Sequence, residues 1–136
     1  MTLQVSHGQG QLLGRVVPSV ITAVQLFKAV ELRTEITLLI AVQAPLGGAN
    51  VADLVVFHDD SGSDVYNIST VVLADRFDRT TAEGFGVALF QAQHPGSGIT
   101  LSPGGSIGVQ TSKINETVFT CYGVTETIAE RLRGIR

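Results

Sequence analysis

Short apolar runs that alternate with polar residues, separated by turns rich in Gly and Asp, dominate the pattern of this chain. The clearest run is 33–43, RTEITLLIAVQ, which alternates as a strand does. Its expected faces are Ile36, Leu38, Ile40 and Val42 on one side, and Thr37, Leu39 and Ala41 on the other. Because apolar residues fall on both faces, we predict a strand that is covered on both sides.

Further strands are predicted along the rest of the chain. Segment 20–30 suits either a helix turn or an edge strand, and its β-branched residues favour the strand. The remaining predicted strands are 51–58, 64–73, 85–91, 99–101, 106–112 and 117–124. Segments 44–50 and 74–84 are expected to be loops, the second one charged and exposed.

Two hairpins are expected from these strands. Segments 51–58 and 64–73 pair around a turn in which Gly62 supplies a positive φ. A closing hairpin joins 106–112 to 117–124. In it Ile107, Val109 and Thr111 fill one sheet face, and Val118, Thr120, Tyr122 and Val124 pair across from them.

Seven or eight short strands at ~10-residue spacing are typical of an antiparallel sandwich or barrel. We therefore predict an all-β fold, an antiparallel β-sandwich with an extended N-terminal arm. The expected divisions are the arm at 1–17, the sandwich at 18–126 and a short C-terminal helix or tail at 127–136. The arm is either a loose terminus or a segment that docks on a neighbouring subunit.

The composition argues against nucleic-acid binding and favours contact with other protein surfaces. Charged residues make up 15% of the chain and the formal net charge is −3, against ~25% charged residues in a typical soluble domain. An acidic chain without clustered Lys and Arg argues against nucleic-acid binding. No apolar run reaches the ~18 residues of a membrane span. The apolar surplus is expected to be buried against copies of the chain or another protein.

The acidic turn HDDSGSD, 58–64, is the first candidate for chemistry. Asp59, Asp60 and Asp64 surround a glycine and could hold a hard cation through oxygen atoms. An EF-hand loop would need a Glu where this chain has Ile68. Asp, Ser and Gly are also the residues that a β-turn selects, and a plain turn is the favoured interpretation.

The other candidates are isolated. His7, His58 and His94 lack a metal-binding spacing, and no G-x-S-x-G elbow accompanies them. The single cysteine, Cys121, is expected to be a buried, inert thiol. The stretches 95–98 and 102–106 lack phosphate-loop spacing and are predicted turns. Accordingly, no catalytic, cofactor-binding or metal-binding residue is predicted.

A small basic group closes the sequence. Arg131, Arg133 and Arg136 form either a solvated tail or a segment that docks on an acidic partner surface.

Four motifs occur in a fixed order along the chain: FHDDSG at 57–62, Tyr66, GITLSPGGSIGVQTS at 98–112 and VFTCYGV at 118–124. This ordered set resembles small jelly-roll proteins of tailed bacteriophages, which implies that the predicted β-sandwich is jelly-roll-like. Such proteins serve as capsid cement or decoration proteins and as tail or fibre components, and are commonly non-enzymatic homotrimers. The resemblance implies a virion protein assembled in the host cytoplasm, with itself and the major capsid protein or another virion protein as partners.

Three functional hypotheses follow. The first is a cement protein that stabilises the capsid through repeated non-covalent contacts. The second is a tail, neck or fibre component, or a carbohydrate- or receptor-binding jelly roll, although the chain has no Trp and two Tyr. The third is a cupin-like metal enzyme, for which the chain lacks the two-histidine strand motif, so no enzyme activity and no cofactor are expected. The charge and the length of the apolar runs likewise lead us to expect no nucleic-acid and no membrane partner.

Overall fold

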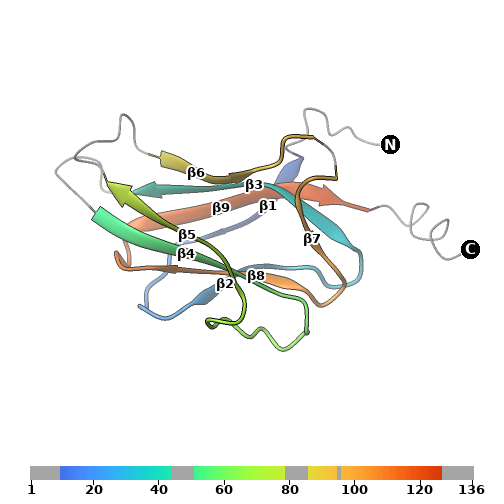
Figure 1. Ribbon diagram of the computed structural model, residues 1–136, viewed down its shortest axis with the longest axis horizontal. Helices are drawn as coiled ribbons and strands as arrows, with labels where there is room; N and C mark the ends of the chain where they lie inside the picture. Colours follow the sequence, from blue (N-terminus) through green and yellow to red (C-terminus); the bar gives the residue numbers. More distant parts are fainter. Residues whose placement is uncertain (1–9, 44–50, 79–85, 95, 127–136) are drawn as a thin grey trace, which may run out of the picture.

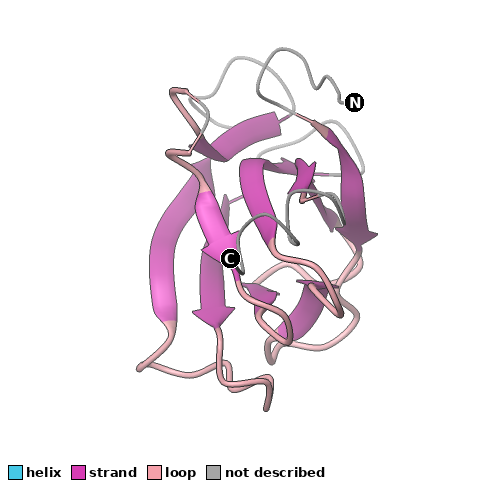
Figure 2. Ribbon diagram, turned by 90° about the vertical axis from the view of Figure 1, so that its right-hand side faces the viewer, coloured by secondary structure: helices cyan, strands magenta, loops and turns pink. Residues whose placement is uncertain are grey.

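Nine strands in two facing antiparallel sheets make up the computed structural model, which describes residues 10–43, 51–78, 86–94 and 96–126 (Figure 1). The strands are β1 (Gln11–Val16), β2 (Val24–Lys28), β3 (Thr34–Gln43), β4 (Val51–Asp59), β5 (Val71–Asp78), β6 (Gly86–Gln91), β7 (Ile99–Leu101), β8 (Ser106–Thr111) and β9 (Thr117–Thr125). Within the described ranges no helix could cross a membrane; strands and loops make up all that is described there (Figure 2). The predicted all-β antiparallel sandwich is confirmed.

The order of the strands is that of a jelly roll. One sheet runs β1-β9-β3-β6, with β7 also paired to β3, and the other runs β2-β8-β4-β5. With the short β7 set aside, β1 pairs with β9, β2 with β8, β3 with β6 and β4 with β5. This nested pairing of first with last strand is a long antiparallel ribbon rolled into two sheets.

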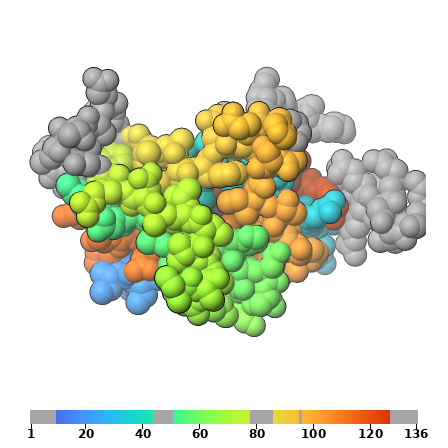
Figure 3. Space-filling model, viewed as in Figure 1, coloured from blue at the N-terminus to red at the C-terminus, as the bar shows by residue number. Residues whose placement is uncertain are grey.

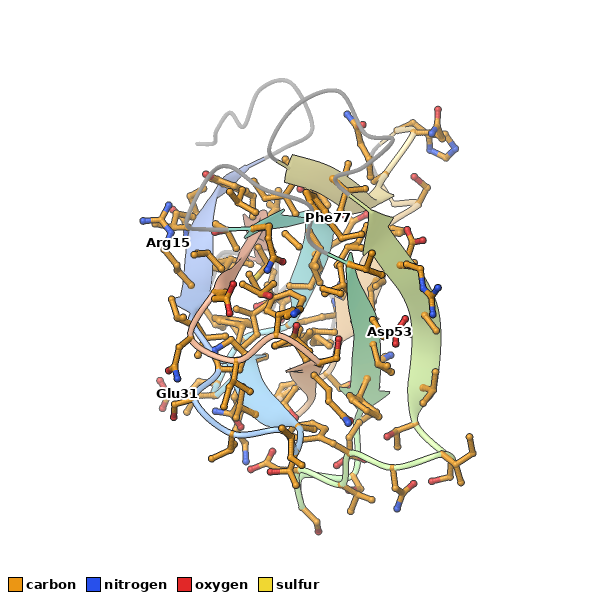
Figure 4. The ribbon with its side chains drawn as sticks, turned by 90° about the vertical axis from the view of Figure 1, so that its left-hand side faces the viewer. Arg15, Glu31, Asp53 and Phe77 are labelled. Atoms are coloured by element: carbon orange, nitrogen blue, oxygen red, sulfur yellow. The ribbon has the colours of Figure 1, made fainter. Side chains whose placement is uncertain are left out.

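The core lies between the two sheets and draws on both. Fully buried apolar side chains come from β3 and β9 on one side and from β4 and β8 on the other; they include Ile36, Leu39, Phe119, Cys121, Leu54, Val56, Ile107 and Val109. Figure 4 shows Phe77 of β5 among the side chains between the sheets, with Arg15 and Asp53 toward opposite outer sides. Each large side chain buried here stabilises the fold by about 1.5–3 kcal/mol.

The predicted faces of β3 are confirmed from Leu38 to Val42, but Ile36 does not share the face of Leu38, Ile40 and Val42 as predicted. The pairing of β3 with β9 shifts between Ile36 and Leu38, which is a β-bulge. A bulge adds one residue to one strand and so exchanges the two faces of the residues after it. Ile36 therefore points into the core together with Leu39 and Ala41, while Leu38 and Ile40 lie on the outer face.

The expected closing hairpin does not form. β8 pairs with β2 and β4, whereas β9 pairs with β1 and β3 in the other sheet. Residues 112–116 therefore cross from one sheet to the other, and Val118 and Tyr122 do not pair across from β8. The inner residues of β9 are Phe119 and Cys121. Alternation defines the face that a residue takes but not the strand beside it, so it could not exclude this crossing.

Two predicted boundaries also move. Residues Gln11–Val16 form β1, paired with β9 from Gln11 opposite Gly123 to Val16 opposite Phe119, so this part of the expected arm 1–17 belongs to a sheet. The return strand begins at Val71 rather than at Asp64, and runs into the expected charged loop as far as Asp78. Since β5 is an edge strand, it accommodates charged side chains that a central strand would not.

Other expectations hold. Segment 20–30 contains an edge strand, β2, and Gly62 has a φ of 89°. Strands β6 and β7 lie within one residue of the predicted bounds. The expected loop 44–50, residues 79–84 of the other expected loop, His7, and the helix or tail 127–136 lie outside the described residues.

The outer faces of the two sheets differ in polarity. The outer face of the five-stranded sheet presents partly exposed apolar side chains, namely Leu38, Ile40, Val42, Val118, Tyr122 and Val124, with Leu12 at 50% exposure. The outer face of the four-stranded sheet is mixed, with an ion pair of 3.0 Å between Arg76 Nε and Asp53 Oδ1 and the aromatic rings of Phe57 and Tyr66. β3 is thus covered on its inner face, while its outer apolar side chains remain partly exposed.

Tyr66 is packed against the four-stranded sheet over a glycine. A Cβ at Gly108 would lie 2.7–2.8 Å from three atoms of the Tyr66 ring, closer than real contacts allow. The ring also lies 6.0 Å from the Phe57 ring, centroid to centroid. Gly108 therefore allows the aromatic ring to approach the backbone of β8.

We expect Gly108→Ala to destabilise the protein by about 1–3 kcal/mol, because the added methyl group displaces the Tyr66 ring. Urea denaturation measures the effect. Tyr66→Ala provides the matched background, since without the ring the same substitution loses its penalty. An equal cost in both backgrounds would contradict this packing.

Candidate interaction surface

Three connections at one end of the sandwich are hydrogen-bonded to one another. The Gly104 amide donates to Ala29 O (2.6 Å), and the Ala29 amide donates to Gly105 O (2.9 Å). The Ser102 amide donates to Asp60 Oδ1 (3.3 Å), which joins the connection after β7 to the one after β4. The predicted turn 102–106 is thus built into this end, and the three connections form one ordered surface.

Asp59 organises the acidic turn from within. Its carboxylate accepts hydrogen bonds from the Val65 amide (2.8 Å), the Ser61 hydroxyl (2.8 Å) and the Ser61 amide (3.1 Å), and the residue is 5% exposed. Because these donors favour the charged form, above all the Val65 amide, they lower the pKa of Asp59 below its usual 3.8. The carboxylate of Asp59 therefore serves the turn itself.

The neighbouring polar groups form a chain across the strands. Lys28 Nζ lies 3.2 Å from Asp64 Oδ1, and the Ser106 hydroxyl donates to the same oxygen at 3.1 Å. The Tyr66 hydroxyl donates to Ser106 Oγ at 2.7 Å. Burial is the main cause that raises the pKa of Tyr66 above 10.0. This chain ties the 59–66 turn to β2 and β8.

Beyond Tyr66, a second turn presents an apolar side chain to solvent. Asn67 Oδ1 accepts from the Ser69 amide (2.8 Å) and hydroxyl (2.6 Å), and the Thr70 hydroxyl donates to Val65 O (2.9 Å). The Ile68 side chain in this turn is 91% exposed. In Figure 3 the green to yellow-green atoms of this region project at the lower edge of the molecule. The turn holds Ile68 outward on a hydrogen-bonded backbone.

The structure keeps the residues of the acidic turn together and places the other candidates for chemistry elsewhere. Asp59, Asp60 and Asp64 lie in one turn, each in hydrogen bonds to nearby groups, and His58 Nε2 lies 3.2 Å from Asp60 Oδ1. His94 lies in the connection between β6 and β7, where its carbonyl accepts from the Ser97 hydroxyl (2.7 Å). In the ranges that the structure describes, no group of three or more His, Cys, Asp or Glu is placed to hold a metal ion.

Cys121 lies in the core, as predicted. Its side chain is fully buried, and burial raises the pKa of the thiol to about 12. A thiol with so high a pKa is protonated at neutral pH and is a poor nucleophile.

Sequence reasoning missed the exposed Ile68 and the link from Tyr66 to Ser106. The signal for the first was local, because N-I-S-T is a run of turn-forming residues around one isoleucine. The second link joins residues 40 positions apart and depends on how β4 and β8 pair. No local pattern carries that information.

Comparisons with protein-family models, with curated proteins and with solved structures found no match to this chain. Its function is therefore inferred from the geometry of its surfaces and from its motifs.

We expect the stability of the protein to fall as the pH drops below 3.8, partly through Asp59. A carboxyl whose pKa is lowered by folding stabilises the native state above its unfolded pKa, and this stabilisation is lost as the pH falls through the folded pKa. Asp59→Asn should reduce stability at pH 7 and reduce its further fall in acid. Urea denaturation across this pH range tests the expectation, with Asp75→Asn on the exposed strand β5 as control. An Asp59→Asn variant as acid-sensitive as the wild type would contradict it.

Proposed function

We propose that this protein is a structural, non-enzymatic component of a tailed-bacteriophage virion, acting as a cement or decoration protein on the capsid. The observation that carries the proposal is the exposure of apolar side chains on ordered backbone. Leu12 of β1 is 50% exposed and Ile68 is 91% exposed, and both lie on hydrogen-bonded elements. Apolar groups held rigidly in water are suited to contact with another protein surface.

The outer face of the five-stranded sheet supports the proposal. It gathers apolar side chains from β1, β3 and β9, such as Leu12, Ile40 and Tyr122. Arg15 on the same face donates to Thr120 Oγ1 (3.3 Å), so its charged group is partly engaged with the sheet. An apolar face of this kind is suited to form the core of an interface with a capsid subunit.

The motif residues behind the phage resemblance support it in another way. Phe57, Tyr66, Ser106 and Gly108 come from three separate parts of the motif set, and in the fold Tyr66 packs against the other three. Three of the motif parts thus meet around Tyr66 on the four-stranded sheet, while the last part, 118–124, lies in β9 of the other sheet. The hydroxyl groups of Tyr66 and Ser106 tie the 59–66 turn to β8 through their hydrogen bonds.

In this role the protein would stabilise the capsid through many weak contacts rather than through a few strong ones. Each copy would bind the major capsid protein and neighbouring copies of itself, in a homotrimer, through the apolar surfaces described above. Repetition of such contacts by the symmetry of the capsid raises the overall avidity well above that of one contact. The particle would then better resist the internal pressure of packaged DNA.

We expect the purified protein to bind phage particles that lack it, and to raise the temperature at which they release DNA. Leu12→Glu places a charge on the apolar outer face and should weaken binding at least tenfold, which corresponds to about 1.4 kcal/mol. Ile21→Glu is the matched control, because Ile21 is 67% exposed on the connection between β1 and β2. Co-sedimentation with the particles and a dye-based DNA-release assay measure the two effects.

Absence of particle binding by the wild-type protein would overturn the cement role. Binding to isolated tails, or to glycans in a glycan screen, would instead support the tail, fibre or carbohydrate-binding alternative. Equal binding by Leu12→Glu and the wild type would show that the outer face of the five-stranded sheet is not the contact surface.

A further inference from the structure

Four exposed apolar side chains gather on the connection between β4 and β5 and on the start of β5. The exposed fractions are 38% for Val65, 91% for Ile68, 36% for Val71 and 49% for Val72. We call these four residues the 65–72 patch. Isolated exposed apolar residues are ordinary, but four within eight residues, on a hydrogen-bonded turn and a paired strand, form a surface that water does not favour.

The turn that precedes the patch is acidic on balance. Asp60 and Asp64 are 44% and 37% exposed at their side chains, and Asp59 contributes a third carboxylate from within the turn. Lys28 Nζ lies 3.2 Å from Asp64 Oδ1 and offsets one of these charges. A partner that covers the patch would therefore bind best if it combined apolar and basic side chains.

The sequence contains a segment of that chemistry. Residues 127–136, TIAERLRGIR, include three Arg and one Glu, so the segment is net +2 while the rest of the chain is net −5. Its larger apolar residues, Ile128, Leu132 and Ile135, are spaced so that they would share one face of a helix. The segment matches the patch in both apolar character and charge.

Two observations indicate that the segment would come from another copy. The described residues of the chain leave Ile68 91% exposed, and in the proposed homotrimer a second copy is available to cover it. The segment follows Glu126, whose amide donates to Arg33 O (2.9 Å) in the connection between β2 and β3, whereas the patch lies on the connection between β4 and β5 and on the start of β5. The two surfaces are different parts of each copy, so a contact between them would be head-to-tail.

We propose that residues 127–136 of one copy dock on the 65–72 patch of the next copy. Head-to-tail contacts of one kind close into a ring when the rotation between copies allows it. The inference rests on the proposed function, in which the protein is a homotrimer, and it assigns the contact that would hold the trimer together. It leaves the outer face of the five-stranded sheet available to the capsid.

Two variants of the full chain test the contact. Ile68→Ser removes the exposed side chain from the patch, and a variant with both Arg131→Ser and Leu132→Ser alters the docking segment. In sedimentation velocity each variant alone should be monomeric where the wild type is trimeric. Ile21→Ser is the matched control, because Ile21 is 67% exposed on the connection between β1 and β2, and this variant should remain trimeric.

The mixture of the two variants gives the sharper result. The intact segment of the Ile68→Ser chain can still dock on the intact patch of the other variant. The equimolar mixture should therefore contain a two-chain species that neither variant forms alone, and its amount should fall as salt is raised. Absence of the two-chain species would overturn the inference, as would a trimeric Ile68→Ser chain.

Particle binding by the same variants separates this inference from the proposed function. Monomeric wild-type protein that still binds particles would overturn the head-to-tail contact and leave the virion role standing. A trimer that dissociates as expected but binds no particle would overturn the virion role alone.

Discussion

The pairing of β3 with β9 is the contact on which the rest of this structure depends. It runs from Thr34 opposite Thr125 to Gln43 opposite Thr117, and so joins parts of the chain about 80 residues apart. β1 adds to the free side of β9, while β6 and β7 add to β3, so the whole five-stranded sheet is assembled on this pair. Closing so long a loop is entropically costly, and the burial of Leu39 and Phe119 against the other sheet offsets that cost.

Once the ribbon is rolled in this way, the connections after β2, β4 and β7 meet at one end. Their mutual hydrogen bonds, such as that from the Gly104 amide to Ala29 O, stabilise loops that would otherwise be free to move. Asp59 and Asn67 hold two successive turns in the longest of these connections. The polar side chains that suggest chemistry in the sequence thus build a scaffold, and this scaffold offers Ile68 and its apolar neighbours to a partner.

Much of the fold follows from the alternation of apolar and polar residues along the chain and from turn chemistry. The apolar run that forms β3 and the buried position of Cys121 are local consequences of strand periodicity, and the φ of Gly62 follows from turn chemistry. The bulge after Ile36 could not be predicted, because it depends on the register with β9. For the same reason, alternation predicts a hairpin where the chain in fact crosses from β8 to β9 in the other sheet.

The candidate surface is less accessible to sequence reasoning. An isoleucine in a run of turn residues is easily assigned to a core, and only the fold shows that Ile68 faces solvent. Tyr66 stands out by its place in a motif, but its role requires Gly108 and Ser106 to lie beside it. Surfaces are built from residues brought together by long-range pairing, and no alternation pattern along the chain encodes that pairing.

In the proposed assembly, copies of this chain cover one another's exposed apolar surface. The most direct measurement of this is the native mass of the full-length protein by light scattering coupled to size exclusion. We expect about 43 kDa, three times the 14.4 kDa of one chain. A mass of 14.4 kDa at all accessible concentrations would contradict the proposal that the copies cover one another.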